Sequence, residues 1–183
     1  MHHAAKCRAA KGFTLLETMI ALLVLFVGIL GLAAMLANAL AYMAGSQYDF
    51  IAQQKAQQAV EAIFTAKYNG SVTWTQVANL NGANPTGLFL PGAQPLLQPG
   101  PDGLVGSVND VGAPRDFILD PGPDGKLGTA DDVQRTLGAF TRTITITNVV
   151  GNANLRTITV TINYTTGRFR RSYTLNTLIS AFN

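Results

Sequence analysis

The stretch AAKGFTLLETMIALLVLFVGILGL, residues 9–32, decides the fold, because it opens a long apolar segment directly after a basic N-terminus. From Thr18 to Gly45 the chain has no charged residue, and this run is longer than the 18 or so residues expected of a membrane-spanning helix. Basic residues precede the run. The positive-inside rule therefore predicts a cytoplasmic N-terminus, with the chain after about residue 45 outside the cytoplasm.

Glu17 is the one charge inside the opening turns of this apolar segment. A carboxylate at the centre of a bilayer costs roughly 2.5–3.5 kcal/mol on insertion scales. Glu17 therefore either lies at the membrane interface, where its side chain reaches the headgroups, or meets a positively charged partner.

The basic character of the chain resides in residues 1–12. The formal net charge is +3, but three of the thirteen basic residues lie in that segment, and the remainder carries ten basic and ten acidic side chains. The net charge therefore does not favour nucleic-acid binding. His2, His3 and Cys7 are the only residues of their types, so the chain from Phe13 onward excludes histidine-based triads, thiolate nucleophiles, ordinary zinc sites and internal disulfides.

Three interpretations account for the N-terminus. A secretory signal cleaved around residues 37–39 conflicts with the length of the apolar run, because an ordinary signal core has about 7–15 residues. A simple uncleaved anchor leaves both Glu17 and the junction of residues 11–13 without an explanation. The third interpretation is a cytoplasmic leader, residues 1–12, that is cut after Gly12.

The sequence KG followed by FTLLE and an apolar helix resembles the type III signal of type IV prepilins and pseudopilins. The resemblance implies that a prepilin peptidase cuts after Gly12 and methylates the new N-terminal Phe13. Within that family, the apolar segment is most similar to minor pilins of the pilus-modification type. A pseudopilin of a type II secretion system shares the same leader and is the alternative.

The resemblance also implies the role, the location and the partners of the protein. It implies a structural filament subunit rather than an enzyme, which passes once through the inner membrane with its head in the periplasm before assembly. After assembly it would lie in a surface pilus or a periplasmic pseudopilus. Its partners would be other pilin subunits in a helical filament, the prepilin peptidase, the inner-membrane assembly platform and the membrane itself.

Cleavage would give Glu17 a partner. It would create an ammonium group at Phe13, one helical turn from the carboxylate of Glu17 on the same or a neighbouring subunit. A buried ion pair favours one register, because a subunit with the wrong offset leaves an uncompensated charge. We expect Glu17 to select the axial offset of each incoming subunit.

The remaining chain predicts an α+β fold. We expect one long helix over residues 13–69, with 13–44 as the membrane span and filament core, because apolar residues continue at helical spacing after residue 50. Residues 138–183 alternate apolar side chains with threonine and predict an antiparallel sheet of three or more strands packed on this helix. Residues 70–137, rich in Gly, Pro and Asn, form a long irregular connection.

The connection contains a repeat. PGPDGLVGSVND (99–110) recurs as PGPDGKLGTADD (121–132). Carboxylate and main-chain oxygens are the ligands that Ca²⁺ prefers, and clustered carboxylates repel one another unless they are neutralised. We therefore predict a Ca²⁺ site in the second repeat and a weaker site, or only a turn, in the first; solvated turn acids are the alternative. The predicted ligands of the second repeat are Asp120, Asp124, Asp131 and Asp132, and those of the first are Asp102, Asn109 and Asp110.

Charge also divides along the chain, because residues 102–132 hold seven acids and residues 133–183 hold six arginines and no acid. We expect the acidic segment to face the basic sheet. A basic surface for nucleic acid, with Arg168, Arg170 and Arg171 around Phe169 and Tyr173, is less favoured because strand alternation places these side chains on opposite faces. A membrane-anchored enzyme would depend on carboxylate or Ser/Lys chemistry, and no catalytic constellation is visible.

Overall fold

The computed structural model describes residues 12, 14–167 and 169–182. By its internal contacts the chain forms two units, Met1–Ala44 and Gly45–Asn183. One helix, α1 (Leu15–Tyr68), contributes to both. It contains no proline and is rich in Ala, Leu and Met, the residues that favour helix most or nearly so.

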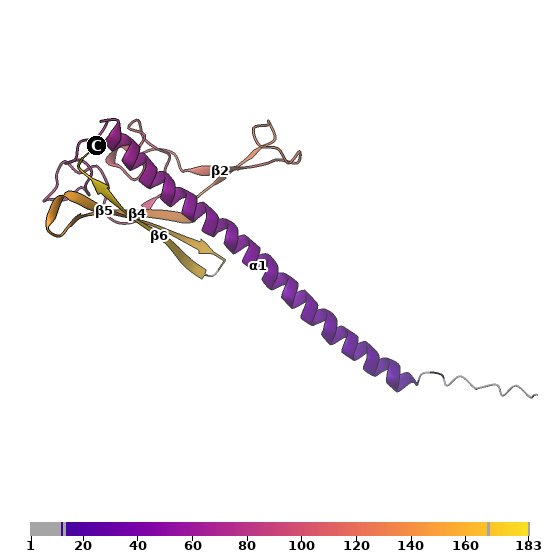
Figure 1. Cartoon of the computed structure of the whole chain (residues 1–183). Coiled ribbons are helices and arrows are strands. Elements are labelled where there is room, and N and C mark those ends of the chain that lie inside the picture. Colours follow the sequence, from indigo (N-terminus) through magenta and orange to yellow (C-terminus); the bar gives the residue numbers. More distant parts are fainter. Residues whose placement is uncertain (1–11, 13, 168, 183) are drawn as a thin grey trace, which may run out of the picture. The chain divides into compact units, whose positions relative to one another are not determined.

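In the second unit, residues of α1 after Gly45 pack on an antiparallel sheet (Figure 1). The sheet has four strands in the order β1-β4-β5-β6. Each of the three long strands pairs with its sequence neighbour, and the turns between them are at Gly151 and Gly167. The strands are β1 (Gln94–Pro95), β4 (Phe140–Val149), β5 (Asn152–Thr166) and β6 (Phe169–Ser180). The expected α+β class is confirmed.

Small side chains bring the helix close to the sheet. Ala52, Ala56 and Ala59 lie on one face of α1 and are completely buried. They share the core with apolar side chains that alternate along the strands, such as Ile158 and Val160 on β5. Because an alanine side chain is short, the backbone of the helix can approach the sheet, and a larger side chain at these positions would overpack the core.

The segment between helix and sheet is more ordered than the sequence predicted. Strand β1 comes from this segment and pairs with β4, so the sheet gains a strand outside residues 138–183. A short 3₁₀ helix, Val108–Asp110, ends the first repeat. Strands β2 (Phe117–Asp120) and β3 (Val133–Thr136) pair as a separate two-stranded sheet that flanks the second repeat. We call residues 117–136 the arm.

Candidate functional site

The start of α1 contains the residues predicted for processing and assembly. Gly12 is exposed and lies before the helix, Phe13 lies outside the described residues, and Glu17 is exposed in the first turn. The predicted contact between a Phe13 ammonium and Glu17 is therefore neither shown nor contradicted. A Cβ atom added at Gly12 would meet no described atom within 4 Å. The described fold itself thus makes no demand for glycine at this position.

Thr14 caps the helix, a role that the sequence analysis missed. Its Oγ1 atom accepts a hydrogen bond from the backbone N–H of Glu17 at 3.2 Å, and its carbonyl oxygen accepts one from Thr18. The spacing Thr-x-x-Glu is the sequence signal of a capping box, and a carboxylate in the first turn also complements the helix dipole. Glu17 therefore has a local reason to be near the helix start, in addition to any partner in a filament.

The apolar half of α1 is uncovered within this single chain. Its large apolar side chains from Leu15 to Met43 are 54–78% exposed. The helix contains an 18-residue window with a mean hydropathy of 2.9, long and apolar enough to cross a membrane. Exposed apolar area of this extent is stable only when lipid or other apolar surfaces cover it.

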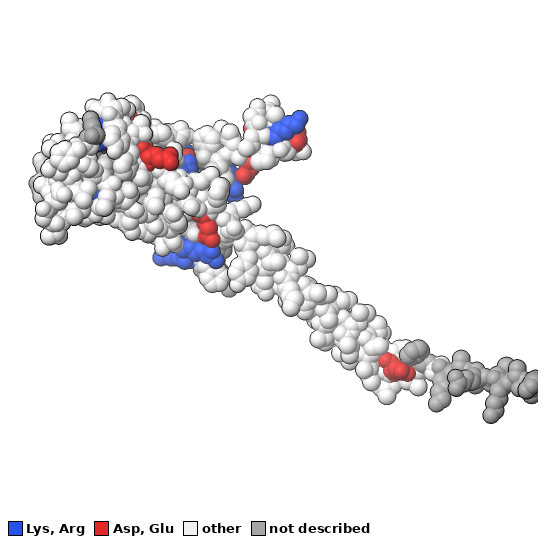
Figure 2. Space-filling view, viewed as in Figure 1, with Lys and Arg blue, Asp and Glu red and all other residues white. Residues whose placement is uncertain are grey.

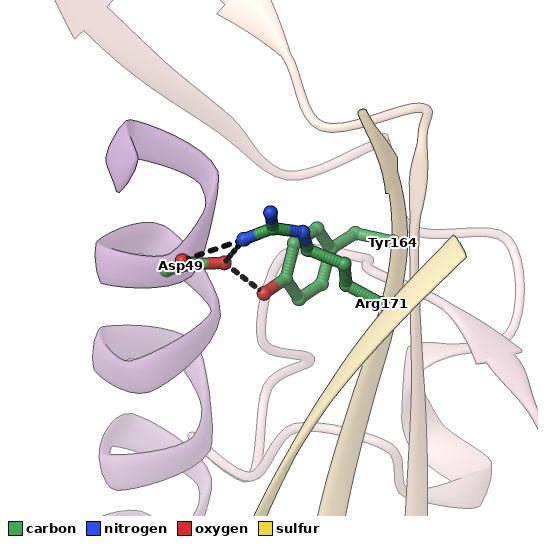
Figure 3. Close-up of polar contacts among 3 residues, drawn as sticks. All are labelled: Asp49, Tyr164 and Arg171. Carbon is green, nitrogen blue, oxygen red and sulfur yellow. Dashed lines mark hydrogen bonds and ion pairs between the residues drawn. The ribbon is translucent and has the colours of Figure 1, made fainter. Parts of the chain in front are cut away.

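At the beginning of the second unit, a polar cluster joins α1 to the sheet (Figure 3). We call Asp49, Tyr164 and Arg171 the latch. The Asp49 carboxylate accepts a hydrogen bond from the Tyr164 hydroxyl and pairs with Arg171 Nη1 at 3.1 Å. Burial raises the pKa of Tyr164 to about 12, and the neighbouring Asp49 charge acts in the same direction. The latch borders an open groove of about 620 Å³ between α1 and β6.

The two sequence repeats fold alike. In both, a main-chain hydrogen bond closes a turn within PGPDG. The aspartate of PGPDG, Asp102 or Asp124, accepts a hydrogen bond from the backbone N–H two residues later. The last aspartate of the repeat, Asp110 or Asp132, accepts one from the backbone N–H of the glycine four residues earlier. The first glycine of each PGPDG has no room for a side chain, because an added Cβ atom would clash with a main-chain oxygen of the same repeat. The distance to that oxygen would be 2.7 Å at Gly100 and 2.3 Å at Gly122. Sequence identity at these positions thus produces the same loop twice.

The two repeats differ in environment. Leu104 and Val105 of the first repeat are buried in the core, and Asp110 is only 2% exposed. The corresponding residues of the second repeat are Lys126 and Leu127, and Leu127 is 64% exposed. The first repeat is therefore a packed structural loop, whereas the second lies at the exposed end of the arm.

The second repeat also lacks one internal donor. Asn109 Nδ2 donates to Asp102 Oδ2 at 2.9 Å in the first repeat. Asp131 replaces this asparagine and cannot donate from an ionised carboxylate. Thr129 Oγ1 donates to Asp131 Oδ1 at 2.6 Å, whereas its counterpart in the first repeat, Ser107 Oγ, donates to Asp102 Oδ2 at 3.0 Å. The Thr129 hydrogen bond is the main reason that the pKa of Asp131 is lowered.

The four acids predicted as calcium ligands do not converge in the described chain. Asp120 pairs with Arg135 across the arm at 2.9 Å, and Asp124, Asp131 and Asp132 each accept hydrogen bonds inside the loop. No three acidic or other metal-binding side chains among the described residues form a group able to hold a metal ion. These hydrogen bonds hold the carboxylates individually, but among the described residues Asp120 is the one of the four with a cationic partner, so calcium binding stays a prediction.

The arginines meet the acidic segment only in part: Arg135 pairs with Asp120, and Arg142 lies close enough to Asp110 and Asp116 for their charges to act on its pKa. Arg171 pairs with Asp49 of the helix, and Arg156 stacks over Trp74 with 4.3 Å between the guanidinium carbon and the ring centroid. Arg142 is 1% exposed, and burial lowers its pKa to about 10 although Asp110 and Asp116 act against that change. Arg168 lies outside the described residues. The sheet therefore does not present these arginines as one basic face.

Comparison with known families gives one match. Residues 7–33 match the model of the prokaryotic N-terminal methylation motif. Searches of curated proteins and of solved structures give no match. The matched residues include Gly12, Phe13 and Glu17, and they continue into the exposed apolar half of α1.

The motif and the helix together define a class of protein. They support a type IV pilin-like or pseudopilin-like subunit. A prepilin-type motif followed by an exposed apolar helix also fits a membrane-anchored protein. The motif implies processing by a prepilin peptidase and assembly with other pilin-like subunits, and it suggests a structural role rather than an enzymatic one.

Proposed function

We propose that this chain is a minor pilin of a type IV pilus, a structural subunit that is processed after Gly12 and helps to assemble or prime the filament. The observation that carries the proposal is the continuity of α1. A methylation motif at residues 7–33 leads into an uncovered apolar helix, and the same helix continues into the core of the second unit, Gly45–Asn183, which we call the head.

This arrangement suits a subunit that leaves the membrane. The apolar half of α1 needs an apolar environment both before and after assembly. Lipid supplies it first, and the packed helices of neighbouring subunits supply it afterwards. The basic residues of the leader favour a cytoplasmic N-terminus, so the head lies outside the cytoplasm in both states.

A pseudopilin of a type II secretion system is the second candidate, and the same residues support it. The choice of the minor pilin rests on the resemblance of the apolar segment to pilins of the pilus-modification type. Neighbouring genes separate the candidates: a retraction ATPase supports the pilus, whereas a secretion channel supports the pseudopilus.

Two measurements test the proposal. Mass spectrometry of the mature protein should find a methylated Phe13 as the N-terminal residue, and sheared filaments should contain the protein. A mature N-terminus near residue 40 would establish an ordinary secretory signal and refute the pilin assignment. Correct cleavage without recovery in any filament or pseudopilus fraction would refute the proposed role as a filament subunit.

Calcium binding by the second repeat stays a prediction. The replacement of Asn109 by Asp131 in the second copy favours it, because a carboxylate stands where the first repeat has an amide donor. The absence of a three-ligand group among the described residues speaks against a preformed site. If Ca²⁺ binds, the loop has to rearrange around it.

A further inference from the structure

The arm and strand β6 are both exposed, and both have unpaired backbone edges. The arm is a two-stranded sheet, and β6 ends the strand order of the four-stranded sheet, so no described strand pairs with its outer side. An exposed edge is a template for pairing with another chain. Twelve residues of β6 are available, from Phe169 to Ser180.

Charge distinguishes the two surfaces. The turn of the arm, residues 121–132, holds Asp124, Asp131 and Asp132 against one base, Lys126. Strand β6 contains Arg170 and Arg171 and no acid. Figure 2 shows basic side chains gathered near the turn between β5 and β6. Arg171 pairs with Asp49, but no described carboxylate lies within ion-pair distance of Arg170.

Exposed apolar side chains accompany the charges on both surfaces. Leu127 and Val133 of the arm are 64% and 59% exposed, and Phe169 and Leu178 of β6 are 72% and 54% exposed. Arginines on an edge strand discourage indiscriminate pairing, yet they favour a partner whose charge is opposite. The arm has the charge, the apolar residues and the open edge that such a partner needs.

We propose that the arm of one copy of this chain docks along the open edge of β6 in a second copy, with the acidic turn beside Arg170. The two surfaces differ, so the contact is heterologous, and a heterologous contact generates open chains of subunits unless it closes into a ring. The inference rests on the proposed filament function and extends it. It implies that copies of this chain lie next to one another in the filament.

Disulfide cross-linking of the full chain tests the docking. Two differently tagged copies, both carrying Cys7→Ser to remove the only native cysteine, are produced together in cells that have the prepilin peptidase. One copy carries Leu127→Cys and the other Ser172→Cys. We expect an oxidised heterodimer of the two tags. Val150→Cys is the matched control, because Val150 is 99% exposed at the turn between β4 and β5.

Charge variants test the reason for docking. Lys126→Glu adds negative charge to the arm and should raise the cross-linked fraction, and Arg170→Glu should lower it. Each change should be about two- to fivefold, the range for exposed ion pairs, and it should shrink as salt is raised. Both residues are exposed, and an unchanged thermal melt checks that the variants fold. Equal cross-linking in all variants, or equal cross-linking to Val150→Cys, would overturn the inference.

The same cells separate this inference from the proposed function. Sheared filaments that contain both cysteine-bearing copies without the arm–β6 cross-link support the function and refute the docking. A cross-link recovered only from membranes, with no protein in filaments, supports the docking between copies and refutes the filament function.

Discussion

Removal of the Tyr164 hydroxyl should destabilise the head measurably at neutral pH. Tyr164 is 5% exposed, and its hydroxyl donates to Asp49. A hydrogen bond to a charged group contributes about 1.5–3 kcal/mol when it is buried. The Asp49 side chain is 47% exposed, so water replaces part of the lost bond. We expect Tyr164→Phe to lower the free energy of unfolding by about 1–2 kcal/mol.

The pH dependence identifies the hydroxyl as the cause. The pKa of Tyr164 is raised to about 12 in the folded chain, above about 10 in the unfolded chain. A raised pKa means that the stabilisation is fully present below pH ~10 and is lost as the pH rises towards ~12. The advantage of the wild type over Tyr164→Phe should therefore disappear across this window, because the phenylalanine variant has no proton to lose there.

Trp74 offers a direct assay. It is the only tryptophan of the chain and belongs to the second unit, so its fluorescence reports on unfolding of the head in detergent-solubilised protein. Tyr173→Phe is the matched control, because it removes a tyrosine hydroxyl from β6 that has no hydrogen-bond partner among the described residues. A Tyr164→Phe variant as stable as wild type at pH 7, or a difference that persists unchanged at high pH, would refute the latch.

Further predictions concern processing, register, calcium and packing. Gly12→Val should block cleavage, seen as a mature mass that retains the leader; normal cleavage would refute the peptidase-site assignment. Glu17→Val should leave cleavage and membrane insertion intact yet reduce the protein in sheared filaments; unchanged incorporation would show that Glu17 does not set register. Calorimetry should detect saturable Ca²⁺ binding that Asp124→Ala combined with Asp131→Ala abolishes; no heat with wild type would end the calcium hypothesis. Ala56→Leu should destabilise the head by about 1–3 kcal/mol in denaturant unfolding because Ala56 is fully buried against the sheet; a neutral effect would contradict the tight packing.

Sequence predicted those elements of the fold whose residue pattern is repeated over a long segment, and missed the short ones. The long apolar run, the helical spacing after residue 50 and the strand alternation predicted α1 and the three long strands, because each pattern is repeated over many residues. Strand β1 has only two residues and the strands of the arm have four each. Segments so short carry no usable periodicity, and their pairing with distant strands was not predictable.

The site shows the same division. Gly12, Phe13 and Glu17 stay predictions for processing and assembly; sequence could propose them because the prepilin-type motif is a linear segment, and the family match to residues 7–33 covers all three. The spacing Thr-x-x-Glu also indicates that Thr14 caps the helix, but the sequence analysis did not use this signal. The latch had no such signal, since Asp49 and Arg171 are 122 positions apart and only the packing of α1 on β5 and β6 brings them together.

The sequence by itself determined that this chain begins with a prepilin-type segment, continues as an apolar helix and ends in alternating strands. It also determined that the two PGPDG repeats form the same turn, because their glycines and aspartates impose the same local hydrogen bonds. Only the tertiary structure decided which repeat is packed and which is exposed. Leu104 and Val105 bury the first repeat in the core, whereas Lys126 and Leu127 leave the second at the end of the arm. The burial of a loop depends on residues that are distant in sequence and pack around it, so the loop's own sequence does not determine it.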